Sequence, residues 1–293
     1  MFFAEIVLTP PESKVLIAKA IAQLQTVKNA VENGLVVTHP SSTATAIVEE
    51  ITGQPPGGIW LAGAVRPKGL CVGYERQVEA KNGSTPSGIE PRKNTSTWVI
   101  EKGVLKKGLE LGEVMQRMTP EDVYVKGCNA VDPSGNAGVL FGKRGGGTIG
   151  FVLATRKKKD FHLILAAGLE KSIPVPIAEA ARAIPFSRVG WSMGLTAGLI
   201  PVGGNTITEV KAIEILYGLR ATPIAAGGLG GAGGCVVLSI QGEERSVRKA
   251  LVNILDEIKG RKGPSVLDVD CLDCPWEECN SELVYRETAA LID

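Results

Sequence analysis

Apolar residues recur at helical spacing along the start of the chain and then give way to short apolar runs. Residues 12 to 32 repeat apolar positions three and four apart, and Asn33-Gly34 supplies a stop, which predicts one amphipathic helix. Leu35-Val36-Val37 predicts a short buried strand, followed by a polar turn and a second helix over residues 44 to 51. A strand, a polar turn and a helix form the kind of unit that binds anions at a helix N-terminus.

The alternation of strands and helices continues to residue 205. Residues 54 to 95 are rich in Gly, Pro, Lys and Arg and predict strands with an exposed loop around residues 81 to 93. Beyond them the periodicity predicts helices at 110 to 118 and 177 to 184 and strands at 122 to 125 and 161 to 167. Residues 1 to 205 are therefore expected to form a Rossmann-like α/β domain, with a mostly parallel sheet and helices on both faces.

The C-terminal part has a different order of elements. The pattern predicts a helix, two strands, a helix and a strand at residues 208 to 218, 222 to 226, 235 to 240, 243 to 259 and 265 to 269. This order predicts a small α+β, ferredoxin-like lobe over residues 206 to 293, which ends in a cysteine-rich segment.

Charge and composition narrow the class of partner. Lys and Arg number 32 against 31 for Asp and Glu, so the net charge of +1 gives no general reason to expect nucleic acid or an anionic membrane as a partner. The N-terminus lacks the pattern of a signal peptide and no window approaches about 18 uninterrupted apolar residues, so a soluble cytoplasmic protein is expected. The 36 glycines concentrate at 142 to 150 and 227 to 234, which indicates tight turns or backbone close to a ligand.

Three segments carry the chemistry of an anion site. Residues 38 to 45, with three consecutive hydroxyl side chains, lie between a predicted strand and a helix, where they either bind phosphate or only cap the helix. Residues 124 to 136 follow a strand and end in turn-forming residues. Residues 140 to 150 place a basic pair before three glycines, which suits phosphate or carboxylate, although a plain surface loop is the alternative.

The order of these segments resembles type A ribose-5-phosphate isomerase, and with it the superfamily of glucosamine-6-phosphate deaminases and coenzyme A transferases. The resemblance rests on the first helix, the 35 to 37 strand, Ser41-Ser42-Thr43-Ala44, and the stretch Lys126-Gly127-Cys128-Asn129-Ala130-Val131-Asp132-Pro133 with Asn136 after it. It also rests on Lys143-Arg144-Gly145-Gly146-Gly147 and on Glu170-Lys171 with Ile173-Pro174-Val175-Pro176. It implies a phosphate-binding cleft at the carboxyl ends of the strands.

The departures from that family decide which reaction is expected. The two aspartates of the family's motif fall on Lys126 and Asn129, its lysine on Arg144 or Lys143, and its glutamate base on Leu153. Moving a proton between adjacent carbons needs a base, so ribose-5-phosphate isomerase activity is not expected. Lys126 in place of an acid favours a more negative ligand, so a bisphosphate, a nucleotide or an acyl-coenzyme A joins the sugar phosphates.

The predicted ligand site gathers the hydroxyl, basic and glycine positions of these segments, together with one lysine that follows a later strand. They are Ser41, Ser42, Thr43, Lys126, Asn129, Asp132, Lys143, Arg144, Gly145, Gly146, Gly147 and Lys171. Catalytic candidates are Lys126 and Glu75, and Glu170 is the other carboxylate considered, each with a solvated surface position as the alternative.

Two further features of the sequence are a group of C-terminal cysteines and a run of glycines. Cys271, Cys274 and Cys279 could hold zinc or part of an iron–sulfur cluster, with structural thiols or a redox pair as alternatives. The 227 to 234 glycine run lies between two predicted strands, which favours a mobile hairpin over the cleft instead of a dinucleotide-binding loop.

The leading hypothesis is a protein that binds a small anionic metabolite. The alternatives are an active, divergent isomerase, lyase or coenzyme A transferase-like enzyme, and a regulatory or metal-binding interaction module. A homo-oligomer that pairs through the small lobe is expected from the resemblance.

Overall fold

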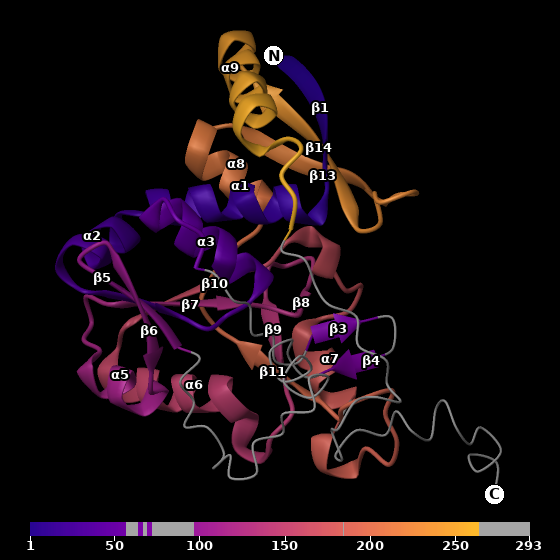
Figure 1. The fold of residues 1–293 in the computed structure, drawn as a ribbon. Helices are drawn as coiled ribbons and strands as arrows, with labels where there is room; N and C mark the ends of the chain where they lie inside the picture. The colour runs from indigo at the N-terminus through magenta and orange to yellow at the C-terminus, as the bar shows by residue number, and fades with distance from the viewer. Residues whose placement is uncertain (57–63, 67–68, 72–96, 184, 264–293) are drawn as a thin grey trace, which may run out of the picture.

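The computed structural model describes residues 1–56, 64–66, 69–71, 97–183 and 185–263 (Figure 1). Its centre is a mixed six-stranded sheet in the order β12-β10-β7-β2-β5-β6. The strands are β12 (Asn205–Ile207), β10 (His162–Ala166), β7 (Val123–Gly127), β2 (Leu35–Thr38), β5 (Thr97–Glu101) and β6 (Val104–Leu109). The first four pair in parallel and the last two antiparallel. The carboxyl ends of the parallel strands therefore meet at one edge of the sheet.

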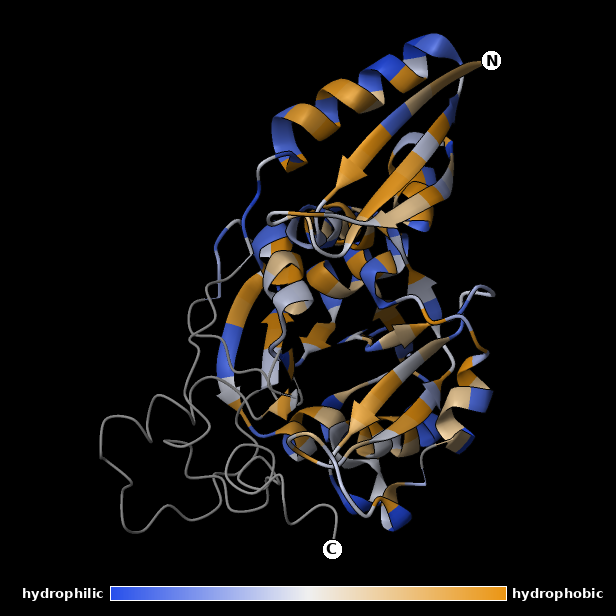
Figure 2. Cartoon of the chain, turned by 90° about the vertical axis from the view of Figure 1, so that its right-hand side faces the viewer, coloured by the Kyte–Doolittle hydropathy of each residue, from blue (hydrophilic) through white to orange (hydrophobic). Residues whose placement is uncertain are grey.

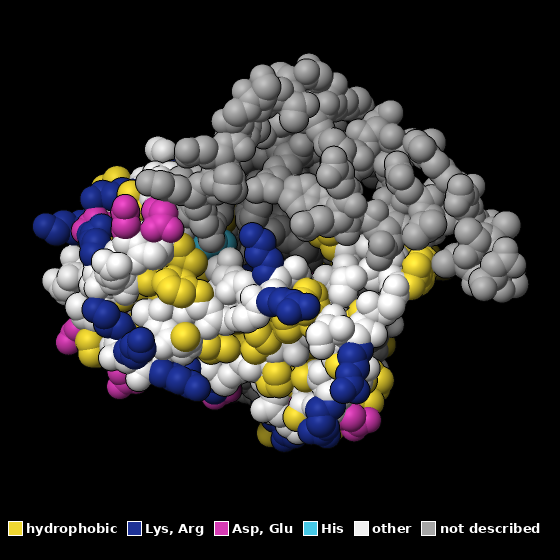
Figure 3. Space-filling view, turned by 90° about the horizontal axis from the view of Figure 1, so that it is seen from below, with side chains coloured by type: hydrophobic (Ala, Val, Ile, Leu, Met, Phe, Trp, Pro, Cys, Tyr) yellow, Lys and Arg dark blue, Asp and Glu magenta, His cyan; other side chains and the backbone are white. Residues whose placement is uncertain are grey.

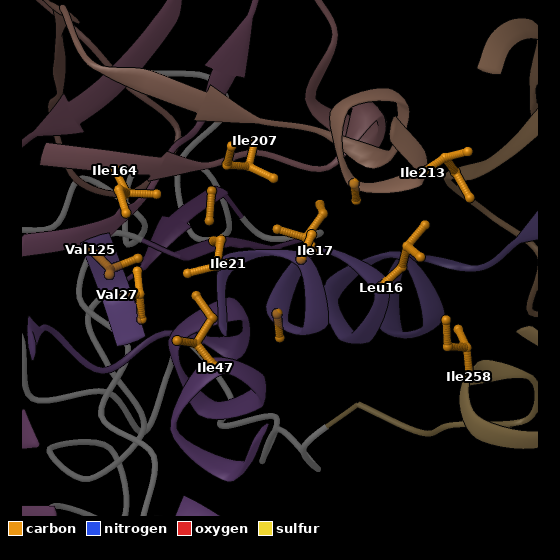
Figure 4. Close-up of a cluster of buried hydrophobic side chains, with 14 of the residues drawn as sticks. Leu16, Ile17, Ile21, Val27, Ile47, Val125, Ile164, Ile207, Ile213 and Ile258 are labelled. Atoms are coloured by element: carbon orange, nitrogen blue, oxygen red, sulfur yellow. The ribbon is translucent and has the colours of Figure 1, made fainter. Parts of the chain in front are cut away.

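Helices cover both faces of this sheet. One face packs against α1 (Pro10–Gln23), α2 (Gln25–Asn33) and α3 (Ser42–Thr52), and the other against α5 (Leu111–Arg117) and α6 (Gly147–Lys159). Side chains alternate along a strand, so β7 sends Val125 into the first core and Tyr124 into the second. Figure 4 shows Ile21 and Ile47 from the helices meeting Val125 and Ile164 from the strands. The prediction of an α/β fold is confirmed.

A second, three-stranded antiparallel sheet has the order β1-β14-β13. It consists of β1 (Phe2–Leu8), β14 (Cys235–Gly242) and β13 (Arg220–Gly227), with α8 (Glu209–Tyr217), α9 (Glu244–Asn253) and the π-helical turn Ile254–Ile258 beside it. Figure 2 shows these strands to be largely hydrophobic, while α9 alternates between hydrophobic and hydrophilic residues. The N-terminal strand in this sheet is a difference from the sequence analysis, which assigned these residues to the first domain.

Helix α1 connects the two sheets. It contacts α3 on the six-stranded sheet and α8 beside the three-stranded one. Figure 4 shows the same arrangement, with Leu16 and Ile17 of α1 near Ile213 of α8 and Ile258 of the C-terminal turn. The first helix therefore belongs to the cores of both layers.

The remaining described elements are short. A third antiparallel sheet has the order β11-β9-β8, and β3 pairs with β4 in a hairpin. These elements are β8 (Ala130–Val131), β9 (Ala137–Phe141), β11 (Gly198–Val202), β3 (Ala64–Arg66), β4 (Gly69–Cys71), α7 (Ile177–Ala183) and the 3-10 turns Arg144–Gly146, Leu169–Lys171 and Phe186–Arg188.

Most predicted elements are observed, with one clear correction. The single helix predicted over residues 12 to 32 is wrong, because the chain breaks at Leu24, whose φ of −62° and ψ of 133° are extended. The helix also begins earlier, at Pro10, where Thr9 and Glu12 form a capping box. The strand predicted at 265 to 269 and the loop at 81 to 93 lie outside the described residues. In the described part of the chain, no helix has the length and apolar character to cross a membrane.

Candidate functional site

The candidate site lies at the carboxyl edge of β2, β7 and β10. A Cβ atom on Gly127, the last residue of β7, would lie 3.2 Å from Ser41 Oγ, so the two segments are in close approach. On the other side, Cys128 N donates to the Ala166 carbonyl of β10 at 3.1 Å. After β2 the chain adds β5 on one side and later returns to β7 on the other, so the order of strands reverses there. In open α/β sheets this is the place where ligands bind.

The loop after β2 starts helix α3. Ser41 is the N-cap, and its Oγ accepts a hydrogen bond from Ala44 N at 3.0 Å. Thr43 is buried, and Ser42 is the first helical residue. The capping alternative is therefore the contact that is observed, and it satisfies the N–H of Ala44, one of the N-terminal donors of α3.

Lys171 interacts electrostatically with two lysines from other elements. Lys14 comes from the first turns of α1, Lys126 from the end of β7, and Lys171 from the 3-10 turn that follows β10. Burial lowers the pKa of the Lys126 ammonium, and the positive charge of Lys171 lowers it further. The interaction with Cys128 raises the pKa and so opposes the shift. Burial also lowers the pKa of Lys14, where Glu170 and Glu209 oppose the shift and Lys171 adds to it. We call Lys14, Lys126 and Lys171 the lysine cluster.

Glu170 is the carboxylate next to the lysine cluster. Its Oε1 lies 3.8 Å from Lys171 Nζ, and both of its oxygens are buried without a hydrogen-bond partner among the described residues. A Cβ atom on Gly234 would lie 3.5 Å from Glu170 Cβ and 3.1 Å from Pro10 Cγ. The hairpin between β13 and β14 therefore reaches both the 3-10 turn and the start of α1. Its mobility and its position over a cleft stay predictions.

Glu209 holds the same 3-10 turn from the other lobe. This carboxylate is fully buried, and Leu169 N donates to both of its oxygens at 3.0 and 2.9 Å. Burial raises the pKa of Glu209 to about 7, with hydrogen bonds from Ser13 and Leu169 in opposition. The group titrates near neutral pH and connects α8 with the turn that carries Lys171.

Two predicted ligand residues have structural partners instead. The Asp132 carboxylate accepts from Ser134 N, Asn136 N, Asn136 Nδ2 and Ile177 N at 2.9 to 3.1 Å. Burial raises the pKa of Asp132, but these hydrogen bonds lower it overall. Asn129 Oδ1 accepts from Leu140 N at 3.0 Å. Both side chains hold the turn between β8 and β9 and the start of α7, so their acceptor groups are occupied by the protein.

The basic glycine loop begins α6. Gly145, Gly146 and Gly147 have φ values of 78°, 85° and 55°, a conformation that favours glycine. Lys143 and Arg144 are exposed, and within the described residues no hydrogen bond or ion pair joins them to Ser41 or to the lysine cluster. Figure 3 shows Lys and Arg side chains spread over the face seen from below, with Asp and Glu near its margins.

The other sequence candidates are not part of the described structure. Glu75, Cys271, Cys274 and Cys279 lie outside the described residues, so the predicted zinc or iron–sulfur site stays a prediction. Among the residues that are described, no group of three or more His, Cys, Asp or Glu could hold a metal ion. Cys128 and Cys235 are buried free thiols.

Sequence reasoning missed Lys14 and Glu209. Each lies on a helix that the apolar spacing predicted, and neither was named as a candidate. Glu209 immediately follows Thr208, the N-cap residue of α8. An acidic residue at that position indicates where a helix begins, but it does not indicate that the side chain is buried. The contact between α1, α8 and the turn after β10 brings both to the site, and no local pattern reports that contact.

The arrangement can bind an anion and can present a lysine amine to it. Ser41 and the N-terminus of α3 supply hydrogen-bond donors, and the lysine cluster supplies positive charge. No protein-family model, curated protein or solved structure was found to match this chain.

Proposed function

We propose that this chain binds a phosphorylated or otherwise anionic small metabolite at the carboxyl edge of β2, β7 and β10. The convergence of Lys14, Lys126 and Lys171 carries the proposal. Of the two described carboxylates beside them, Glu170 lacks a hydrogen-bonded partner among the described residues, whereas Glu209 accepts from Leu169 N. Clustered ammonium groups repel each other, and a bound anion removes that repulsion and stabilises the charged form of each lysine.

The class of ligand follows from the donors. A phosphate fits the N-terminus of α3 and a lysine ammonium, so a sugar phosphate, a nucleotide or a coenzyme A-type ligand is proposed. We do not propose ribose-5-phosphate isomerase activity, because the family's base falls on Leu153, which packs against the second core. We also propose a finer fold assignment. The main domain is Rossmann-like, the small lobe is ferredoxin-like, and the chain belongs to the isomerase, deaminase and transferase superfamily.

The cellular setting is part of the proposal. The balance of 32 basic and 31 acidic residues supports a cytoplasmic protein without a nucleic acid or membrane partner. A homo-oligomer through the small lobe is supported by the edge strand β13, whose residues from Thr222 to Gly227 are exposed.

A thermal-shift series tests the binding proposal. Inorganic phosphate, ribose 5-phosphate, a nucleoside diphosphate and acetyl-coenzyme A are titrated against the full chain, and a ligand at 100 times its dissociation constant should stabilise by about 2.7 kcal/mol. Lys14→Met and Lys171→Met should weaken the response by at least about tenfold in dissociation constant. Lys28→Met is the matched control, because Lys28 is exposed on α2 and lies outside the site.

Two results would overturn the proposal. The first is the absence of stabilisation by every anion in the series. The second is an equal loss of response in Lys28→Met and in the cluster variants, since that would show a nonspecific effect of net charge.

A further inference from the structure

The three-stranded sheet of the small lobe has one covered face and one open face. Ile6 of β1 and Val236, Leu238 and Ile240 of β14 point into the core that α1, α8 and α9 share. Side chains alternate along a strand, so the residues between these point to the opposite face. In Figure 1, α8 and α9 lie on one side of these strands, and no described helix lies on the other. We call this second side the open face.

The open face carries apolar side chains. Phe3 and Val7 of β1 are 60% and 48% exposed. Val7 pairs in the register with Val237 of β14, which is partly exposed, and Val237 pairs with the exposed Ala225 of β13. Single exposed apolar residues are ordinary, but an apolar row across three adjacent strands indicates an interaction site.

The open face also carries two charges of opposite sign on its outer strands. Glu5 of β1 pairs in the register with Ser239 of β14, and Arg220 of β13 pairs with Gln241 of β14. Both charged side chains are exposed, and neither forms an ion pair in the described part of the chain. An acid on one side and a base on the other therefore flank a central strand whose polar residues are uncharged.

The edges of this sheet are less suited to pairing than its open face. Pro223 has no N–H to donate from β13, and a bulge between Pro223 and Ala225 interrupts that strand. On β1, Lys259 Nζ donates to the Val7 carbonyl at 3.1 Å and places a charge beside the strand. A partner is therefore expected to contact the side chains of the open face and not the backbone of an edge.

We propose that the open face binds the open face of a second copy of this chain. This inference rests on the homo-oligomer of the proposed function and names its surface, but it does not involve the anion site. Two sheets that pack face to face keep their strands nearly aligned. A two-fold axis between the sheets and parallel to β14 would place β14 over its own copy and β1 over β13 of the second copy.

The central strand suits contact with its own copy. Val237, Ser239 and Gln241 lie along β14, so such an axis brings each of them close to the same residue of the second copy. Two valines make an apolar contact. A hydroxyl and an amide each both donate and accept hydrogen bonds, so Ser239 and Gln241 can also pair with themselves.

The outer strands are complementary to each other in the same arrangement. Val7 faces Ala225 of the second copy, and Phe3 faces Arg220, whose guanidinium can stack on the ring. Glu5 lies one pair of residues further along its strand, about 7 Å from the position opposite Arg220. The long arginine side chain can span that distance, so the two unpaired charges of each copy pair across the interface.

Charge disfavours the other face-to-face arrangement. A two-fold axis perpendicular to the strands would place β1 over its own copy, with Glu5 opposite Glu5 and Phe3 opposite Val7. Like charges in direct opposition cost free energy, and Arg220 would face Ala225 without a carboxylate nearby. The charges of the open face therefore select the axis parallel to β14.

The size of the open face sets the expected strength of the dimer. Three strands about 4.8 Å apart form a face only about 14 Å wide, which is at the small end of specific protein interfaces. Association in the micromolar range is therefore expected, with monomer and dimer in exchange.

Sedimentation velocity of the full chain tests the proposal. From about 2 to about 200 µM, the average mass should rise from that of one chain toward that of two. Phe3→Ser should weaken dimerisation by at least about tenfold. Val104→Ser is the matched control and should leave it unchanged, because Val104 of β6 is 62% exposed but lies on the six-stranded sheet.

Exchange of the two charges tests the arrangement of the copies. Glu5→Arg and Arg220→Glu should each weaken self-association by at least about tenfold, because each leaves like charges opposed. An equimolar mixture of the two variants should form dimers again, since opposite charges then meet between unlike chains. This recovery would also show that both variants are folded.

The outcomes separate this inference from the binding proposal. A chain that is monomeric at every concentration overturns the dimer, and so does a dimer that Phe3→Ser weakens no more than Val104→Ser does. Variants that associate no better when mixed than alone overturn the arrangement about the axis parallel to β14. Phe3→Ser should keep the thermal-shift response to phosphate, so loss of that response in the wild type with an intact dimer counts against the anion site alone.

Discussion

Two regions that follow central strands, the Asp132 turn and the lysine cluster, carry buried charge in different ways. At the Asp132 turn, four donor groups hydrogen-bond to one carboxylate. At the lysine cluster, both oxygens of Glu170 lack a hydrogen-bond partner among the described residues, and Lys126 has no carboxylate partner there. Buried polar groups are normally satisfied, so the first region serves the fold, whereas the second is where we propose that a ligand binds.

The largest expected effect is on the turn. Asp132→Ala should lower the free energy of unfolding by about 3 kcal/mol, because it leaves the N–H groups of Ser134, Asn136 and Ile177 without their acceptor. Asp132→Asn should lose about half as much, since one oxygen still accepts. Urea unfolding measures both. A loss below about 1 kcal/mol in the alanine variant, together with a lost response to phosphate, would move Asp132 back into the ligand site.

The next effect concerns Glu209 and pH. The pKa of Glu209 is raised from 4.5 to about 7 in the folded chain, so the folded state binds this proton more tightly than the unfolded state does. Its stabilising contribution is full below about pH 4.5 and is lost as the pH rises through about 7, a change of about 2.5 kcal/mol between pH 5 and pH 8. Glu209→Gln should remove this part of the pH dependence, as measured by urea unfolding from pH 5 to pH 8.

A matched control exists on the same helix. Glu214 of α8 is exposed and pairs with Lys211, so Glu214→Gln should leave the pH profile parallel to that of the wild type. Parallel profiles for Glu209→Gln as well would show that burial does not hold the proton on Glu209.

Substitutions of Ser41 should have an intermediate effect on stability, and they separate its role as the N-cap of α3 from its proposed role in binding phosphate. Ser41→Ala should cost about 1 kcal/mol, because Ala44 N loses its acceptor at the N-cap, whereas Ser41→Gly should cost a few tenths. Both variants should also weaken stabilisation by phosphate in the thermal-shift assay. An unchanged phosphate response would leave Ser41 with the capping role alone.

The smallest effect is expected at the glycine loop. Arg144→Ala should change the free energy of unfolding by less than about 0.5 kcal/mol, because Arg144 is exposed. Its response to inorganic phosphate should stay within about twofold of wild type, in contrast to Lys171→Met. Loss of the phosphate response in Arg144→Ala would show that the glycine loop and the lysine cluster bind the same anion, as the sequence resemblance implies.

Local patterns predicted the elements that carry the site more reliably than the site itself. The apolar run at Leu35 and the hydroxyls after it correctly predicted β2 and the start of α3. Lys126 and Lys171 were identified because both follow predicted strands. The break at Leu24 was missed because no Gly or Pro marks it, and β1 was missed because its partner β14 lies more than 220 residues away in the chain.

The sequence by itself determined the alternation of strands and helices, the polar turn at Ser41 and the lack of a carboxylate at Leu153. These depend on residue type and spacing, which act within a few positions of the chain. Only the tertiary structure decided which polar groups are satisfied. Asp132 is occupied because the start of α7 packs against its turn, and Lys14 joins Lys126 and Lys171 because α1 contacts both sheets, which are long-range contacts that burial of apolar surface enforces.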